Sequence, residues 1–309
     1  MAILDNIIHW AKGEEAIRVV VMTGSRAGKG PVDDLSDYDL AIFTCDADKY
    51  TRDDAWLQDI AEVVVCVEDQ TYDDLGPTQE SPWAVIPEQH FLTVNEIPTR
   101  LVIFKGGFKV DFAFYPLMTL DRLVIMAVLP FAYDMGYKIL LDKDEITKSL
   151  PKPTFTVPIS EKPSQEEFDR VVREFFFEVY HVAKHLKRDD LWHAKFRDWT
   201  TKEFLLKMIE WYELAQHNWQ YDVCYLGKKM KSWVDGSTWT ALSNVFGHFD
   251  AGDGWKALEM TIELFRKLAT KLANTLSYEY PYDVDRSITI LALEQIKTLK
   301  LHRNGDKNG

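Results

Sequence analysis

A proline-rich segment divides this chain of 309 residues into two parts with different sequence patterns. The segment Pro151 to Pro163 reads PKPTFTVPISEKP and carries four prolines. Each proline lacks the backbone N–H that helices and sheets use, and it also restricts the residue before it. We therefore expect a first domain over residues 1–150, a linker over residues 151–163 and a second domain over residues 164–309.

The first part has the pattern of a sheet with flanking helices. Two apolar runs, IRVVVMT (Ile17 to Thr23) and YDLAIF (Tyr38 to Phe43), have the length and composition of β-strands. Two more runs, Arg100 to Phe104 and Lys109 to Tyr115, flank the pair Gly106-Gly107, which a tight hairpin prefers. The acidic, proline-containing stretch between Asp69 and Thr99 predicts a long surface loop.

The second part has a helical pattern. Ser164 to Glu167 forms a capping box, in which serine and glutamate side chains satisfy free N–H groups at the start of a helix. Apolar residues then recur at spacings of three and four from Phe168 to Leu186, and again from Trp255 to Leu276. We expect a helical bundle after the mixed sheet, so the fold class of the whole chain is α+β.

The first candidate binding residues follow the first strand. Gly24 ends the apolar run, and without a Cβ atom it lets the backbone approach a ligand closely. Ser25 and the adjacent N–H groups can hydrogen-bond phosphate oxygens. Arg26 adds a planar, permanently charged group that suits phosphate. We interpret Gly24, Ser25 and Arg26 as a binding site for a triphosphate.

Two aspartates mark a candidate metal site at the start of the next strand. Asp37 and Asp39 are two residues apart, so strand alternation directs both carboxylates to the same face. Neighbouring carboxylates repel each other unless a cation neutralises them. Magnesium does so in proteins with one or two carboxylates and substrate phosphates. This pair therefore predicts a magnesium site.

Asp111 is the third candidate ligand. It lies in the apolar strand Lys109 to Tyr115, where an unpaired charge is costly. If this strand lies beside Tyr38 to Phe43, the three aspartates converge on one site. The alternative is a core aspartate bonded to backbone N–H groups.

The order and spacing of these motifs resemble those of the DNA polymerase β-type nucleotidyltransferases. The segments GSRAGKGPVDDLSDYDLAIF, DDAWL, KVDFAFYP, LLDKD and YEYPYDVDRSIT look like the aminoglycoside 6-adenylyltransferase family, which modifies streptomycin. The resemblance implies transfer of AMP from ATP to a hydroxyl of an aminoglycoside. It also implies two Mg²⁺ ions held by Asp37 and Asp39. It further implies that Asp111 completes the binding site of the ion nearest the acceptor and accepts the proton of the acceptor hydroxyl.

The resemblance further implies that the helical domain closes over the nucleotide and shapes the acceptor pocket. Candidate triphosphate ligands there are Arg188, Lys195 and Lys202. Trp192 offers an aromatic face beside carboxylates, which suits a guanidinium-bearing sugar through cation–π contacts and charge-assisted hydrogen bonds. The candidate acceptor ligands besides Trp192 are Asp189, Asp190, Asp198 and the loop residue Glu88. An ordinary solvated helix face is the competing interpretation.

The formal net charge of −13 bears on the partners. Nucleic-acid binding needs clustered Lys and Arg to displace counterions, whereas an acidic surface attracts a cationic small molecule. No apolar run approaches the roughly 20 residues that span a bilayer, and the N-terminus does not resemble a signal peptide. We expect a cytoplasmic protein that binds neither nucleic acid nor membrane, as a monomer or weak homodimer.

Two alternatives stay open from the sequence. One keeps the chemistry but changes the acceptor to another antibiotic or to a protein hydroxyl. The other is a nucleotidyltransferase-like regulatory or antitoxin module fused to, or paired with, a helical RNase-like domain. Arg188 to His193 fits the loose R-x4-H pattern of such helical nucleases. The acidic charge disfavours RNA as the substrate of that module.

Overall fold

The computed structural model describes residues 2–72, 96–125 and 129–300. The chain forms two compact units, Met1–Thr156 and Val157–Gly309, and each is described by itself. Residues 151–164, all of which are described, contain no helix or strand. Among the described residues, no helix is long and apolar enough to cross a membrane.

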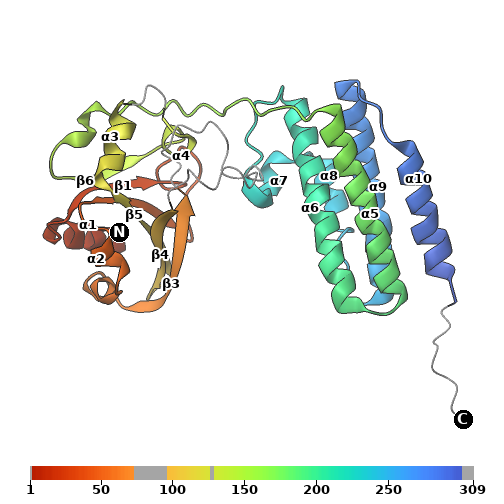
Figure 1. Ribbon diagram of the computed structural model, residues 1–309, viewed down its shortest axis with the longest axis horizontal. Coiled ribbons are helices and arrows are strands. Elements are labelled where there is room, and N and C mark those ends of the chain that lie inside the picture. The colour runs from red at the N-terminus through yellow and green to blue at the C-terminus, as the bar shows by residue number, and fades with distance from the viewer. Residues whose placement is uncertain (1, 73–95, 126–128, 301–309) are drawn as a thin grey trace, which may run out of the picture. The chain divides into compact units, whose positions relative to one another are not determined.

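The first unit is built on a six-stranded mixed sheet with strand order β3-β4-β5-β2-β1-β6 (Figure 1). Strands β2 and β5 are parallel, and the other neighbours are antiparallel. The strands are β1 (Ile17–Thr23), β2 (Tyr38–Thr44), β3 (Val63–Tyr72), β4 (Glu96–Phe104), β5 (Phe108–Pro116) and β6 (Lys138–Asp142).

Helices cover both faces of this sheet, because both faces of its central strands are apolar. Helix α1 (Ala2–Gly13) contributes Ile3, Ile7 and Trp10 to the core on one face. Helix α3 (Leu117–Ile125) contributes Leu120 and Leu123 to the core on the other. The shorter helices are α2 (Asp48–Thr51), η1 (Ala55–Asp59), α4 (Phe131–Asp134) and η3 (Ile146–Ser149). The expected mixed sheet flanked by helices is confirmed.

The predicted hairpin is confirmed, and the predicted surface loop is shorter than expected. Gly107 N donates to Phe104 O at 3.0 Å, and both glycines of the turn have positive φ. Strand β3 continues to Tyr72 and pairs with β4 from Glu96, so both ends of the predicted loop are strand. Backbone pairing with β4 overrides the polar composition there. The rest of that stretch lies outside the described residues.

The second unit is a helical bundle, as the sequence predicts. Its long helices are α5 (Gln165–Lys187), α6 (Leu191–Gln216) and α9 (Ala251–Leu276). The predicted capping box is confirmed, since Ser164 Oγ accepts from Glu167 N and Glu167 Oε2 accepts from Ser164 N. The shorter helices are η4 (Tyr225–Gly227), α7 (Met230–Trp233), α8 (Gly236–Leu242), α10 (Tyr282–Thr289) and the π-helix η5 (Ile290–Ile296).

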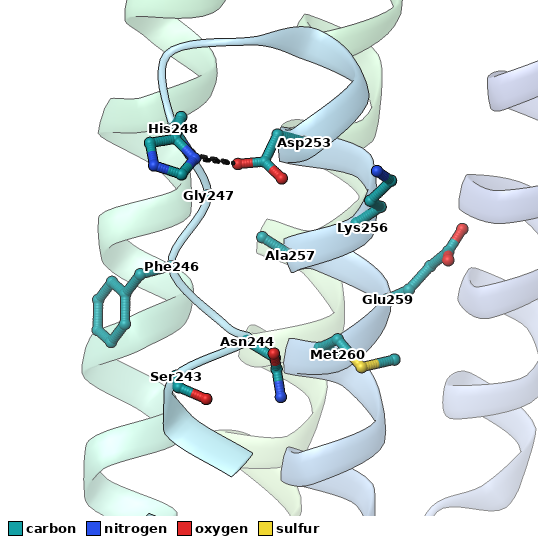
Figure 2. A pocket seen from close by; sticks show the side chains of 10 residues that line it. All are labelled: Ser243, Asn244, Phe246, Gly247, His248, Asp253, Lys256, Ala257, Glu259 and Met260. Atoms are coloured by element: carbon teal, nitrogen blue, oxygen red, sulfur yellow. Dashed lines mark hydrogen bonds and ion pairs between the residues drawn. The ribbon is translucent and has the colours of Figure 1, made fainter. Parts of the chain in front are cut away.

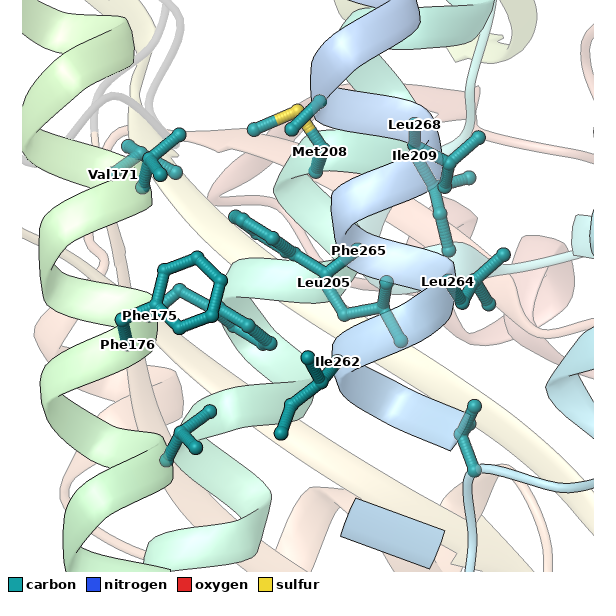
Figure 3. Packing of buried hydrophobic residues seen from close by; sticks show 14 of the residues in the cluster. Val171, Phe175, Phe176, Leu205, Met208, Ile209, Ile262, Leu264, Phe265 and Leu268 are labelled. Atoms are coloured by element: carbon teal, nitrogen blue, oxygen red, sulfur yellow. The ribbon is translucent and has the colours of Figure 1, made fainter. Parts of the chain in front are cut away.

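The core of the bundle is formed by side chains from α5, α6 and α9 that pack between the helices (Figure 3). Phe175 from α5 and Phe265 from α9 are fully buried, and their rings stack with centroids 3.6 Å apart. Stacked aromatic rings add to the free energy gained from burying their area. This pair therefore joins the first and last long helices.

We predict that Phe175→Ala destabilises the protein by about 3–5 kcal/mol, because the substitution leaves a cavity among packed rings. Phe177→Ala is the matched control, since Phe177 lies on the same helix with a side chain that is 61% exposed. It should change stability by no more than about 0.5 kcal/mol. Urea unfolding of the full chain, followed by circular dichroism, measures both changes. Equal losses would contradict the assigned packing.

Candidate active site

The three predicted aspartates lie together on the first unit. Strands β2 and β5 are parallel neighbours, and Asp39 lies opposite Asp111 in their ladder. Asp37 immediately precedes β2. Tyr38, which lies between Asp37 and Asp39, is buried in the core. The two strands are therefore neighbours, which is the condition for the three aspartates to lie near one another. The side chains of Asp37 and Asp111 are 42% and 25% exposed, so solvent and a ligand can reach them.

A lysine that the sequence analysis missed joins two of these carboxylates. Lys109 Nζ lies 2.9 Å from Asp37 Oδ2, 2.9 Å from Asp111 Oδ1 and 2.8 Å from Asp111 Oδ2. Lys109 and Asp111 are two residues apart on β5, so they lie on the same face of the sheet. That spacing was the available signal, since a lysine two residues before a lone aspartate in a strand is placed to pair with it.

The charges at this site shift two pKa values. Burial raises the pKa of the Asp111 carboxyl, and the nearby Asp37 and Asp69 raise it further against the opposing effect of Lys109. Burial alone lowers the pKa of Lys109, but hydrogen bonds to Asp111 and Asp37 outweigh burial, and the net shift is upward. Lys109 is therefore an ammonium ion at neutral pH.

Gly24 leaves space for the carboxylate of Asp39, which lies against its backbone. Its φ is +67°, a left-handed conformation that L side chains rarely adopt. A Cβ atom at this position would lie 1.9 Å from Asp39 Oδ2. Thr23 pairs with Asp39 across β1 and β2, so the end of β1 and the start of β2 are held in register. Only glycine allows this close approach of backbone to carboxylate.

Ser25 and Arg26 follow Gly24 in a tight turn. Ala27 N and Gly28 N both donate to Gly24 O at 3.1 Å, and Ser25 is exposed. Arg26 Nε donates to Ser36 O at 2.9 Å.

The Arg26 guanidinium also lies 4.0 Å from the ring centroid of Tyr38. Arg26 therefore braces the segment that leads into Asp37 and Asp39. Its predicted contact with a triphosphate stays a prediction.

Lys202 and Asp198, two of the candidate ligands on α6, contact each other in the structure. Lys202 is 6% exposed, and its Nζ lies 2.6 Å from Asp198 Oδ1 and 3.0 Å from Thr261 Oγ1 on α9. The two residues form an enclosed ion pair within α6, and the hydrogen bond to Thr261 connects the pair to α9. The reason is that this face of α6 packs on α9 instead of meeting solvent. The contact of Lys202 with a triphosphate and that of Asp198 with the acceptor stay predictions.

Lys195 also has a structural contact. Its Nζ donates to Gly247 O at 2.6 Å, and the ammonium of Lys202 lies 5.7 Å from the ring centroid of Phe246. Both lysines thus hold the segment 243–248, which lines a hollow of about 420 Å³ against α9.

Figure 2 shows His248 and Asp253 at the rim of this hollow, with Nδ1 and Oδ2 2.7 Å apart. The lining residues are Ser243, Asn244, Phe246, Gly247, His248, Asp253, Lys256, Ala257, Glu259 and Met260.

The remaining candidates of the helical unit gather where α5 ends and α6 begins. Arg188, Asp189 and Asp190 are exposed, and Asp190 Oδ2 lies 3.1 Å from His185 Nδ1. Trp192 is 82% exposed on the first turn of α6. These side chains are accessible to a ligand, as the prediction requires. Glu88 lies outside the described residues.

The carboxylates of the first unit fit magnesium in pairs. Among the described residues, no group of three or more His, Cys, Asp and Glu side chains is gathered to hold a metal ion by itself. Magnesium does not need such a group, because one or two carboxylates and substrate phosphates suffice. The ammonium of Lys109 between Asp37 and Asp111 already indicates that this surface favours positive charge.

A family model and several known proteins match this chain over most of its length. A family model described as streptomycin adenylyltransferase matches residues 1–292. A curated protein named aminoglycoside 6-adenylyltransferase from Campylobacter jejuni is 28% identical over 298 residues, covering 96% of this chain and 95% of that protein. A protein of the same name from Bacillus subtilis is 25% identical over 289 residues, covering 93% and 94%. The crystal structure of an aminoglycoside 6-adenyltransferase from Bacillus subtilis matches with a TM-score of 0.44 and 22% identity, covering 96% of this chain and 98% of that chain.

We predict that Gly24→Ala lowers the free energy of unfolding by at least about 1–2 kcal/mol, the cost of a left-handed conformation for an L residue. The clash with Asp39 adds to this cost. Gly30→Ala is the control in the same loop, because a Cβ there meets nothing within 4 Å. Urea unfolding of both variants measures the difference. A Gly24→Ala variant as stable as Gly30→Ala would show that Gly24 does not seat Asp39.

Proposed function

This chain belongs to the streptomycin adenylyltransferase family, and we propose that it transfers AMP from Mg-ATP to a hydroxyl group of an aminoglycoside, with streptomycin as the first candidate. The observation that carries this proposal is the placement of Asp39 opposite Asp111 on parallel strands, with Gly24 against Asp39. This arrangement puts three carboxylates and a close backbone turn on one face. Such a face suits a nucleotide triphosphate with its magnesium.

Asp37 and Asp39 hold the magnesium that enters with the triphosphate. When bound, the ion neutralises phosphate charge and stabilises the leaving pyrophosphate. Gly24 leaves room for the backbone to approach the phosphates, and the exposed Ser25 offers its hydroxyl and N–H groups to them. The protein contributes positioning and electrostatic stabilisation, as in phosphoryl transfer generally.

Asp111 is the proposed general base. Burial raises the pKa of its carboxyl, which makes the carboxylate a stronger proton acceptor. It accepts the proton of the acceptor hydroxyl as that oxygen bonds to the α-phosphorus of ATP. The bond between the α-phosphorus and the bridging oxygen breaks at the same time, and pyrophosphate leaves. The product is an AMP ester of the acceptor.

Charge and accessibility support an aminoglycoside acceptor. The net charge of −13 attracts polycations. Trp192, Asp189 and Asp190 form an exposed surface with the aromatic and acidic groups that a guanidinium-bearing sugar requires. The curated relatives from Campylobacter jejuni and Bacillus subtilis carry the name aminoglycoside 6-adenylyltransferase. Another antibiotic or a protein hydroxyl is the remaining alternative.

We predict that the purified protein releases pyrophosphate from ATP when streptomycin and Mg²⁺ are both present, and that EDTA abolishes this release. Mass spectrometry should find streptomycin heavier by one adenylyl group. Lincomycin is the control acceptor, because it lacks the guanidinium groups of streptomycin. Turnover in excess chelator would exclude the magnesium-dependent reaction. Transfer to lincomycin alone would exclude the proposed acceptor.

We predict different effects for two conservative substitutions. Asp39→Asn should weaken Mg-ATP binding as well as turnover, because it removes a ligand of the nucleotide's metal. Asp111→Asn should leave Mg-ATP binding largely intact and lower kcat by about 10²–10⁴-fold, the usual cost of losing a general base. Calorimetric titration of Mg-ATP and steady-state rates measure the two effects separately.

The control for both variants is Asp34→Asn, an exposed position in the same loop. It should resemble the wild type in both measurements. If Asp111→Asn turns over within a few-fold of the wild type, Asp111 is a core aspartate and another residue accepts the proton.

A further inference from the structure

The ammonium of Lys109 lies against Asp111, the carboxylate that the sequence predicts to serve a second magnesium ion. We propose that Lys109 replaces the acceptor-side metal, so that the enzyme uses one magnesium ion, held by Asp37 and Asp39, beside a fixed lysine. This inference rests on the proposed function. It changes the number of metal ions and gives Lys109, a residue without an assigned role, a place in the reaction.

The contacts of Lys109 leave little room for a metal at Asp111. An ammonium has three N–H donors, and three carboxylate oxygens lie 2.8–2.9 Å from this one. Both oxygens of Asp111 are among them. A magnesium ion would lie about 2.0–2.1 Å from a carboxylate oxygen. A magnesium ion bound to Asp111 would therefore place a second cation beside the ammonium of Lys109, and the two positive charges would repel each other.

The position of Lys109 is built into the strand. Lys109 and Asp111 flank Val110, whose side chain is fully buried, so the backbone of β5 fixes both residues on the opposite face. The side chain of Lys109 is 37% exposed and crosses to Asp37 at the start of β2. A lysine held from two neighbouring strands differs from a surface lysine, whose ammonium is free to sample many positions.

The carboxylate oxygens that Lys109 contacts support a single metal ion. Lys109 contacts both oxygens of Asp111 but only one oxygen of Asp37. Lys109 contacts Oδ2 of Asp37, and the carboxylate of Asp37 would hold a magnesium ion together with Asp39. Within the part of the chain that the structure describes, no group of three or more His, Cys, Asp and Glu side chains is arranged to hold one metal ion. Two carboxylates and the triphosphate are a usual ligand set for magnesium.

Lys109 can also supply what the second metal supplies in other enzymes. A two-metal site stabilises negative charge on the attacking oxygen as well as on the leaving oxygen. A positive charge next to Asp111 stabilises the attacking oxygen as it loses its proton. Lys109 thus has two roles in this proposal: its hydrogen bonds position Asp111, and its charge acts on the attacking oxygen.

The number of bound ions tests this inference directly. The probe is Mn²⁺ with α,β-methylene ATP, whose α,β-bridge resists adenylyl transfer, and the readout is the electron paramagnetic resonance spectrum of the frozen complex. We expect the wild type to show one magnetically isolated Mn²⁺ ion per chain. Lys109→Met should admit a second ion, and two ions about 3.5–4 Å apart give a broadened, coupled spectrum.

Two variants control for the loss of charge and for a general effect of lysine removal. Lys109→Arg keeps the positive charge and should show one ion. Lys105→Met removes a lysine from the same hairpin, where it pairs with Glu62 and is 70% exposed, and should also show one ion. Thermal unfolding of each variant establishes that it is folded before its spectrum is recorded.

A coupled pair of ions in the wild type would overturn the inference, even if Lys109→Met did not fold. A single isolated ion in folded Lys109→Met would overturn it as well, because Lys109 would then exclude no metal. The proposed function fails by a different result, namely no binding of the manganese–nucleotide complex or no transfer of AMP to any acceptor by the wild type.

Discussion

Repulsion between carboxylates is the constraint on which the arrangement of the first unit depends. The parallel pairing of β2 with β5 puts Asp39 opposite Asp111, and Asp37 lies two residues before Asp39. Three negative charges on one face would destabilise the sheet unless positive charge is held among them. Lys109, a residue of β5, supplies this positive charge through its contacts with Asp37 and Asp111. The buried faces of both strands in turn fix the charges in place.

The part of this site that follows strand alternation could be predicted from sequence. Asp37 and Asp39 share a face because they are two residues apart, and Asp111 joins them because its strand is the parallel neighbour. The position of long side chains could not be predicted in the same way. The Arg26 side chain donates to the backbone oxygen of Ser36, ten residues later in the chain. Only the packed structure shows whether such a side chain bonds the protein or extends into solvent.

The helical unit shows the same division between local and long-range information. The capping box at Ser164 was predictable, because all of its hydrogen bonds lie within four residues. The placement of Lys202 was not, because helical periodicity does not say which neighbour covers a given face. Its partner across the interface, Thr261, is 59 residues away in the chain. The extension of β3 to Tyr72 was missed for the same reason, since pairing with β4 decides it.

The enclosed pair of Lys202 and Asp198 has a consequence for how this family can diverge. Loss of one partner leaves an unpaired buried charge, which typically costs 3–5 kcal/mol, a large part of the stability of an ordinary domain. Single substitutions at either position should thus be selected against, whereas a simultaneous exchange for two apolar residues of similar volume is tolerable. Among homologues, the two positions should change together or not at all.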